Sequence, residues 1–335
     1  MTTRRFTVRR DQSGQTVLDW LRARLALSPD AARRLLRQRQ VRVGGTPWLN
    51  PAQRLRAGQH VEIDARPRPP GGPAPKPANG PRPPAGLAPP VVRFADAHVV
   101  VVEKPAGLTT MRHAEEAAEF GARGRRYLPP TLADLLPALL AHGKPGRQPP
   151  VRAVHRIDKE TSGLVVFART AAAESNLGRQ FRAHGIDRRY LALVRGRARP
   201  GRIESWLMRD RGDGRSGSGA TPGEGQHAVT HVRVVEELGE YTLVECRLET
   251  GRTHQVRIHL GEAGTPLCGE RVYDRPPNGK PLPDASGAGR VMLHAAALGF
   301  DHPVTGKRMQ WTSPPPKDMA DLVRRLRRQA ARPGP

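Results

Sequence analysis

Near its middle the chain reads His155-Arg156-Ile157-Asp158-Lys159-Glu160-Thr161-Ser162-Gly163-Leu164-Val165-Val166-Phe167. The last four residues are an unbroken apolar run of strand length, which predicts a buried strand. The charged and polar residues before it then form a loop that leads into the core. A loop held by a buried strand is a common place for a catalytic carboxylate, because the strand fixes its position. On this stretch alone, Asp158 could equally be a salt-bridged structural residue.

A second polar segment bears on Asp158. It reads Leu248-Glu249-Thr250-Gly251-Arg252-Thr253-His254-Gln255-Val256-Arg257-Ile258-His259-Leu260 and alternates polar with apolar residues. The alternation predicts a strand with Thr253, Gln255, Arg257 and His259 on one face. An arginine in such core-like sequence needs a buried partner charge, and Asp158 is the natural candidate. A neighbouring Arg257 would keep Asp158 ionised and usable as a nucleophile.

The surrounding sequence predicts more strands than helices. Apolar runs or alternation indicate strands at 91–94, 99–102, 164–167, 190–194, 230–235, 241–248 and near 291–298. Apolar stripes at helical spacing indicate helices at 131–140 and 174–184, and residues 211–225 are predicted to form a mobile loop. The order of these elements predicts an α+β domain with a mixed, largely antiparallel sheet.

Composition divides the chain and points to a polyanionic partner. Lys and Arg total 56 against 31 Asp and Glu, a formal net charge of +25 that favours binding to nucleic acid. Residues 66–90 contain 11 Pro and four Gly, a composition that cannot bury a core and is typical of a linker. We therefore expect a domain at 1–65, a linker at 66–90 and a larger domain at 91–335.

The N-terminal piece is predicted to be a small αβ unit. One helix starts near Gln15-Thr16, and a second starts at Ser28-Pro29 with Ser28 as its cap. A short strand at 41–43 and a turn at Gly44-Gly45 follow. Residues 14–64 resemble the RNA-binding domain of ribosomal small-subunit protein four, the S-four-like domain. The resemblance implies that the second helix meets structured RNA through Arg33, Arg34 and Arg37; a solvated helix face without a partner is the alternative.

Residues 91–316 resemble the RluA-type family of RNA pseudouridine synthases. Six blocks carry the resemblance, in the order found in the family: 104–108 (Lys-Pro-Ala-Gly-Leu), 155–163, 189–196, 251–260, 267–273, and Leu293-His294-Ala295 with His302-Pro303. The family usually has Leu where Ile157 stands, a conservative difference. The resemblance implies the pseudouridine synthase fold, an isomerase that uses no cofactor, and an RNA substrate. Large-subunit ribosomal RNA or a pre-ribosomal particle is the expected partner.

The same resemblance implies roles for individual residues. Asp158 would be the nucleophile that breaks the uridine glycosidic bond, Arg257 would pair with it, and Tyr190 would lie over the uracil and help a proton move. Arg156 would enter the RNA stack where the uridine is flipped out. The expected RNA-binding set also includes His155, Arg252, His254 and Gln255, of which His254 and Gln255 would support the site rather than react. Whether Asp158 attacks the ribose, attacks the base or only drives elimination stays open.

The sequence supports an RNA-modifying enzyme better than it supports a metal enzyme, an exported or membrane protein, or a non-catalytic binding protein. Cys246 and Cys268 have no metal-ligand spacing, and no signal peptide or membrane span is evident, so we expect a monomeric cytoplasmic protein without a metal. A metal-dependent nuclease would fit the 12 His but lacks compact ligand spacing. The remaining alternative is a ribosome-assembly or RNA-binding protein that has lost catalysis. Such a protein would not need Asp158, Tyr190 and Arg257 together.

Overall fold

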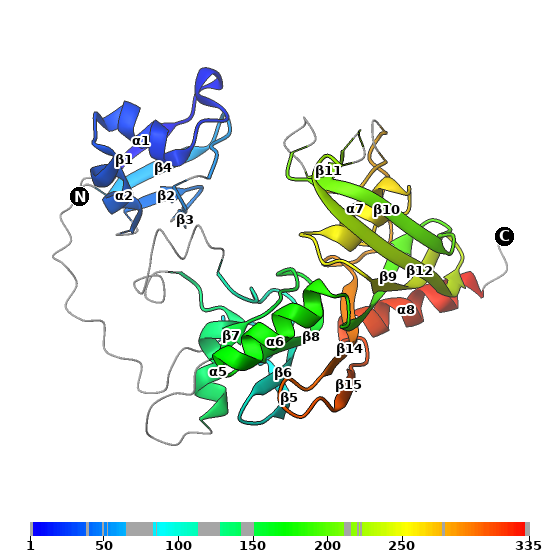
Figure 1. Cartoon of the computed structure of the whole chain (residues 1–335). Helices are drawn as coiled ribbons and strands as arrows, with labels where there is room; N and C mark the ends of the chain where they lie inside the picture. The colour runs from blue at the N-terminus through cyan, green and yellow to red at the C-terminus, as the bar shows by residue number, and fades with distance from the viewer. Residues whose placement is uncertain are drawn as a thin grey trace. The chain divides into compact units, whose positions relative to one another are not determined.

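The structure is a computed structural model that describes most of the chain (Figure 1). The described residues are 3–37, 40–48, 50–51, 53–64, 83–84, 86–112, 128–141, 151–210, 216–219, 221, 223–276 and 279–331. They divide into two compact units: residues 3–64 carry the first, and the residues from 83 onward, apart from Leu128 and Pro129, carry the second. Most of the predicted linker at 66–90 lies outside the described residues, as do 211–215 of the predicted loop at 211–225.

The first unit is a small sheet with two helices. The strands β1 (Thr3–Thr7), β4 (His60–Asp64), β2 (Val41–Val43) and β3 (Thr46–Pro47) lie in that order, each antiparallel to its neighbour. A 3-10 turn, η1 (Arg10–Gln12), follows β1. The two predicted helices are present as α1 (Val17–Leu25) and α2 (Pro29–Arg37), and the hydroxyl of Ser28 accepts the Ala31 N–H as the predicted cap. Trp20, Leu21 and Leu36 fill the core between helices and sheet.

The second unit is built on one 11-stranded sheet, which confirms the predicted α+β class. Its main path runs β11-β10-β12-β13-β9-β14-β8-β6-β5, with β15 beside β14 and β7 beside β8. Every pairing is antiparallel except the one between β14 and β8. The strands are β5 (Val91–Ala95), β6 (Val99–Lys104), β7 (Arg152–Ala153), β8 (Ser162–Ala168), β9 (Asp187–Arg195), β10 (Gly201–Met208), β11 (Gly217–Ser218), β12 (Gln226–Leu238), β13 (Tyr241–Leu248), β14 (Leu293–Asp301) and β15 (Arg308–Thr312).

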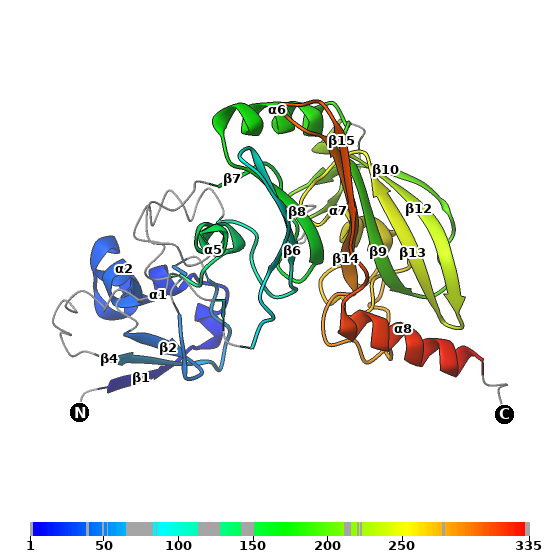
Figure 2. The same ribbon diagram turned by 90° about the horizontal axis from the view of Figure 1, so that it is seen from below.

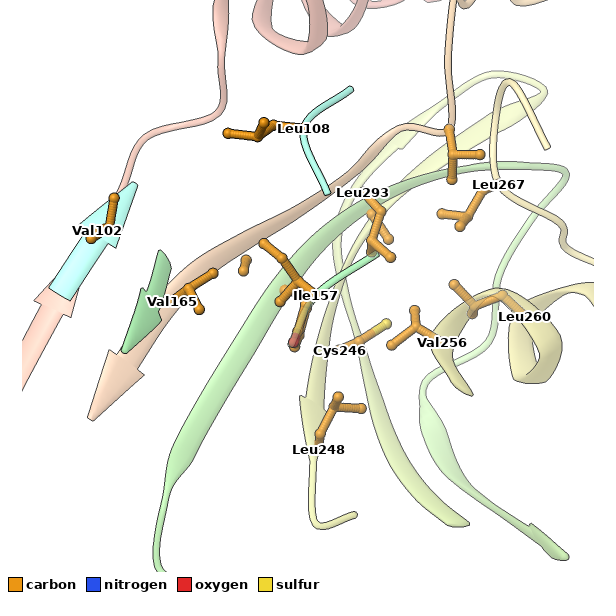
Figure 3. Packing of buried hydrophobic residues seen from close by; sticks show 14 of the residues in the cluster. Val102, Leu108, Ile157, Val165, Cys246, Leu248, Val256, Leu260, Leu267 and Leu293 are labelled. Atoms are coloured by element: carbon orange, nitrogen blue, oxygen red, sulfur yellow. The ribbon is translucent and has the colours of Figure 1, made fainter. Parts of the chain in front are cut away.

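Helices cover both faces of this sheet. The helices are α5 (Leu132–Leu140), α6 (Ala171–Arg182), α7 (Gln255–Glu262) and α8 (Lys317–Ala330). Because side chains alternate along a strand, Leu193 of β9 faces α8 while Ala192 and Val194 face the core that contains α7. The central strands are therefore buried from both sides, by α8 on one face and α7 on the other (Figure 2). Figure 3 shows the α7 side, where Val256 and Leu260 pack with Cys246, Leu248 and Leu293.

The predicted strand through residues 253–259 is wrong, because Thr253 and His254 form a turn and helix α7 begins at Gln255. All seven residues from Gln255 to Gly261 are buried, so the helix has no solvent face whose period could reveal it. Its polar side chains bond within the core: Gln255 to Val229 and Thr230, and His259 to Thr230 and Ser205. The alternation that looked like a strand reflects buried polar residues with partners.

The parallel contact between β8 and β14 depends on Gly163. Its φ is +111°, and a Cβ there would lie 2.3 Å from the backbone oxygen of Ala295. Both the backbone angle and the clash oppose any side chain. We expect Gly163→Ala to lower the free energy of unfolding by about 3 kcal/mol, measured by urea denaturation. Gly306→Ala is the control, because Gly306 has a φ of +68° with nothing near its Cβ position; an equal effect of the two changes would contradict the close-contact argument.

Candidate active site

Asp158 lies in the loop between β7 and β8, immediately before the buried strand. Its backbone oxygen accepts the Thr161 N–H at 3.1 Å, which closes a turn that leads into Ser162 and β8. Its carboxylate is partly exposed, with 18% of the side chain accessible. The Oδ2 atom is 3.7 Å from Nη1 of Arg257, and Oδ1 is 4.0 Å from Nε2 of His254. The sequence segments at 155–164 and 251–260 thus meet around one carboxylate.

The helix explains why two residues of α7 reach Asp158. His254 is the residue that caps α7, and Arg257 is three positions further on, so both side chains lie on the same side of the helix. In the predicted strand they would have pointed to opposite faces. His254 adopts a left-handed backbone (φ 58°), and its Nδ1 is 2.8 Å from the hydroxyl of Tyr273. Burial lowers the pKa of His254 against the opposing charge of Asp158, which favours a neutral ring at neutral pH.

The closest partner of Arg257 is a second carboxylate, Glu270, which the sequence did not suggest. Glu270 accepts two hydrogen bonds from the guanidinium, from Nε at 2.7 Å and from Nη2 at 3.0 Å, and its side chain is wholly buried. Its Oε1 also accepts the backbone N–H groups of Arg271 and Val272 at 3.0 and 2.8 Å. Burial favours the neutral forms, yet the pKa of Arg257 is raised and that of Glu270 lowered, because the ion pair outweighs burial. Both partners are therefore charged, and Arg257 is held in place for Asp158.

Tyr190 and Asp158 line one cavity. Tyr190 projects from β9 and is 8% exposed; burial raises its pKa to about 12, with Arg188 opposing and Asp158 reinforcing the shift. The cavity has a volume of about 420 Å³, a size typical of a small-ligand site. Its lining includes Asp158, Tyr190, Arg257, Ile157 and Leu293, so a flat apolar ring with polar edges can be held beside the carboxylate. The predicted trio of Asp158, Tyr190 and Arg257 is thus brought together.

The other predicted site residues fall into two groups. Arg156 and Arg252 are exposed at the cavity, and Arg252 Nε donates to the His227 oxygen at 2.9 Å. His155 and Gln255 line the cavity but bond inward. His155 Nε2 accepts the Val166 N–H at 3.0 Å, and burial lowers its pKa to about 3. Gln255 is 2% exposed and accepts from the Thr250 hydroxyl and the Arg252 N–H. Both residues support the loops that carry the site.

The predicted RNA-binding arginines of the first unit are described in part. Arg33 is exposed on α2. The side chains of Arg34 and Arg37 lie outside the part of the chain that the structure describes.

A buried lysine contacts the Asp158 loop, and no role was predicted for it. Lys104 ends β6 with no exposed surface, and its ammonium donates to the backbone oxygens of Pro105, Leu108 and Lys159 at 2.9, 2.7 and 3.1 Å. Burial lowers its pKa to about 7, although Asp158 and Glu160 oppose the shift. Lys104 therefore ties the 104–108 block to the residue that follows Asp158. The burial of Lys104 is hard to predict from the sequence, because the four valines at 99–102 indicate an apolar strand and give no sign that it ends in a buried charge.

Lys104 should make stability depend on pH. The folded pKa is about 7 and the unfolded value about 10.4, so above pH 7 the unfolded chain holds a proton that the folded chain releases. The free energy of unfolding should then rise with pH from 7 to 8.5. We expect Lys104→Met to flatten this rise, measured by urea denaturation at several pH values, with the exposed Lys317→Met as control. Equal slopes in the two variants would contradict the assignment.

In the parts of the chain that the structure describes, no helix is both long and apolar enough to cross a membrane. Among the same residues, no group of three or more His, Cys, Asp or Glu side chains is placed to hold a metal ion.

Comparison with known proteins identifies the family. The sequence model of the RNA pseudouridylate synthase family matches residues 98–262, which contain Asp158, Tyr190 and Arg257. The ribosomal large subunit pseudouridine synthase D of Zymomonas mobilis is 38% identical over 76% of this chain and 77% of its own. An uncharacterized RNA pseudouridine synthase of Mycobacterium bovis is 32% identical over 98% of this chain and 99% of its own.

A solved structure supports the fold. Human RNA pseudouridylate synthase domain containing 4 aligns with a TM-score of 0.54 over 70% of this chain and 92% of its own, at 23% identity. The sequence relatives and this shared fold confirm the predicted resemblance: the chain belongs to the RluA-type family of RNA pseudouridine synthases and is an isomerase of that class.

Proposed function

We propose that this enzyme converts specific uridines of large-subunit ribosomal RNA to pseudouridine, with Asp158 as its nucleophile. The observation that carries the residue assignment is the Asp158 carboxylate 3.7 Å from Arg257, itself fixed by Glu270, in the cavity that Tyr190 lines. A carboxylate can act as a nucleophile, and the fixed guanidinium sets an opposite charge beside it. The choice of RNA rests on relatives from Zymomonas mobilis and Nitrosomonas europaea that are named ribosomal large subunit pseudouridine synthase D.

The reaction needs a flipped base and little chemistry from the protein. The bond between ribose carbon 1′ and uracil nitrogen 1 breaks, the uracil turns, and carbon 1′ joins carbon 5, which loses a proton while nitrogen 1 gains one. Asp158 assists the cleavage, and the walls of the cavity keep the detached uracil in place. Tyr190 offers an aromatic face for stacking and a hydroxyl that stays protonated at neutral pH. The exposed Arg156 would fill the gap that the extruded uridine leaves in the RNA.

The proposal is tested in cells by mapping pseudouridines in total RNA from a strain that lacks this gene. We expect one or more large-subunit positions to lose pseudouridine and to regain it with the wild-type gene but not with Asp158→Ala. Loss only in transfer RNA or small-subunit RNA would refute the substrate assignment. Restoration by Asp158→Ala would refute the nucleophile and favour a binding or assembly role.

For the first unit we propose an S-four-like RNA-binding role. Its support is the order of two helices and a short β hairpin, with Arg33 exposed on the second helix. Each phosphate contact by a basic side chain steepens the dependence of affinity on salt. Deleting residues 1–65 should therefore weaken binding to ribosomal RNA and reduce the salt slope, while activity on a short stem-loop persists. Binding titrations at several salt concentrations measure this, and an unchanged slope would contradict it.

A further inference from the structure

Part of the lining of the active-site cavity is strongly basic. Besides Asp158 and Tyr190, the lining includes Phe181, His184, Gly251 and the arginines Arg182, Arg188 and Arg252, which we call the basic group. Among the described residues that line the cavity, Asp158 is the sole carboxylate. Since Asp158 lies beside Arg257, the described residues of the cavity lining offer the basic group no other acidic side chain.

Arg188 is the most informative residue of the basic group. It stands two positions before Tyr190 on β9, so both side chains project from the same face of the sheet. It is 7% exposed, and its Nη2 donates to the backbone oxygen of Glu249 at 2.9 Å. Its Nε is buried without a hydrogen-bond partner. Its guanidinium lies 5.4 Å from the centre of the Phe181 ring. Among the described residues, no carboxylate forms an ion pair with it.

The turn at residues 249–252, next to Arg188, directs the Glu249 carboxylate away from the guanidinium. The Glu249 carboxylate binds His231 Nε2 at 2.5 Å, so what Glu249 offers Arg188 is a backbone oxygen. At Gly251 a Cβ would lie 2.4 Å from Nη1 of Arg188, so the turn passes directly over the guanidinium. A buried guanidinium without a counter-charge is costly. The cost falls when an anion enters the cavity, and a phosphate matches the planar donors of arginine particularly well.

We propose that Arg188, with Arg182 and Arg252 at the cavity rim, forms a phosphate-binding subsite that holds one backbone phosphodiester next to the flipped uridine. The inference rests on the proposed function, because it assumes an RNA substrate whose uracil lies at Asp158. Arg188 and Tyr190 share one strand face, so a single rigid element would position both the phosphate and the base. Fixing both ends of one nucleotide restricts its rotation while its own uracil turns.

The test uses the full chain with Asp158→Asn, so that the RNA does not react during the measurement. The probe is a synthetic stem-loop with an all-uridine loop, together with a set in which each loop phosphate in turn is a neutral methylphosphonate. Affinities are compared for this protein and for versions that also carry Arg188→Gln, Arg188→Lys or Arg189→Gln. Arg189 is the matched control, because it is the next residue of β9 and faces the opposite side of the sheet. Its Nε lies 3.4 Å from Oδ2 of Asp187. Thermal unfolding checks that each variant folds.

The subsite predicts a non-additive result at one phosphate. We expect a methylphosphonate at one loop position to weaken binding about tenfold when Arg188 is present. In the Arg188→Gln variant, which already lacks the contact, the same methylphosphonate should weaken binding little. Arg188→Lys should keep part of the effect, and Arg189→Gln should leave it intact. Additive losses at every position would overturn the subsite. If Arg188→Gln does not fold, Arg252→Gln takes its place, and additivity there overturns it equally. Asp158-dependent pseudouridine in cells tests the function separately, so either proposal can fail alone.

Discussion

Asp158→Asn is expected to abolish pseudouridine formation while leaving the protein folded and able to bind RNA. Asparagine keeps the shape of the side chain but removes the charge and the nucleophilic oxygen. Loss of a nucleophile lowers turnover on the order of 10⁴-fold or more. The partly exposed position of Asp158 and its 3.7 Å distance from Arg257 imply that the change costs little stability, because Arg257 retains Glu270 as its partner.

The measurement is pseudouridine by mass spectrometry after incubation of purified protein with ribosomal RNA from the deletion strain. Glu160→Gln is the matched control, since Glu160 is an acidic residue in the same loop that does not line the cavity. It should retain activity near the wild-type level. Full activity of Asp158→Asn would show that another group breaks the glycosidic bond. Equal losses in both variants would show that the loop is merely sensitive to change.

Some strands of the large sheet were predictable from the sequence and others were not. The apolar run at 164–167 was predictable because four successive apolar residues require burial, and the strand at 241–248 because polar and apolar residues alternate over its second half. Strands β10 and β15 were not predicted; both carry exposed and half-exposed residues throughout most of their length. β10 pairs with β11 and β12, and β15 pairs with β14; a local pattern of apolar residues records neither pairing.

In the site, the residue types were predictable and their geometry was not. Asp158, Tyr190 and Arg257 came from separate segments, and their resemblance to a known family named them together. Helix α7 was missed because its polar residues find buried partners on β10, β12 and the 266–273 segment. The role of Glu270 followed from nothing local, since its partner lies 13 positions away on another element. A buried ion pair of this kind becomes visible only when the fold brings its members together.

Glu270 is where a single change should disturb the site most without touching the cavity. Glu270→Gln removes the charge that compensates Arg257, although the amide can still accept the backbone N–H groups of Arg271 and Val272. Breaking a buried ion pair on one side leaves the other charge uncompensated, so we expect the free energy of unfolding to fall by about 3 kcal/mol. Arg257 should then move toward Asp158 or solvent, and turnover should fall on the order of 10²-fold.

The kinetic constants distinguish a positioning role of Glu270 from a merely structural one. If Glu270 positions Arg257, the loss appears in kcat with little change in KM, and Glu270→Asp restores part of it because the charge returns. The control is Glu236→Gln, which breaks an equally bidentate pair with Arg327, at 2.7 Å for both bonds, but on an exposed surface. Such a pair contributes about 1 kcal/mol or less, so that variant should stay stable and active. If Glu270→Gln unfolds no more easily than Glu236→Gln and keeps its kcat, Arg257 does not need the buried carboxylate to serve Asp158.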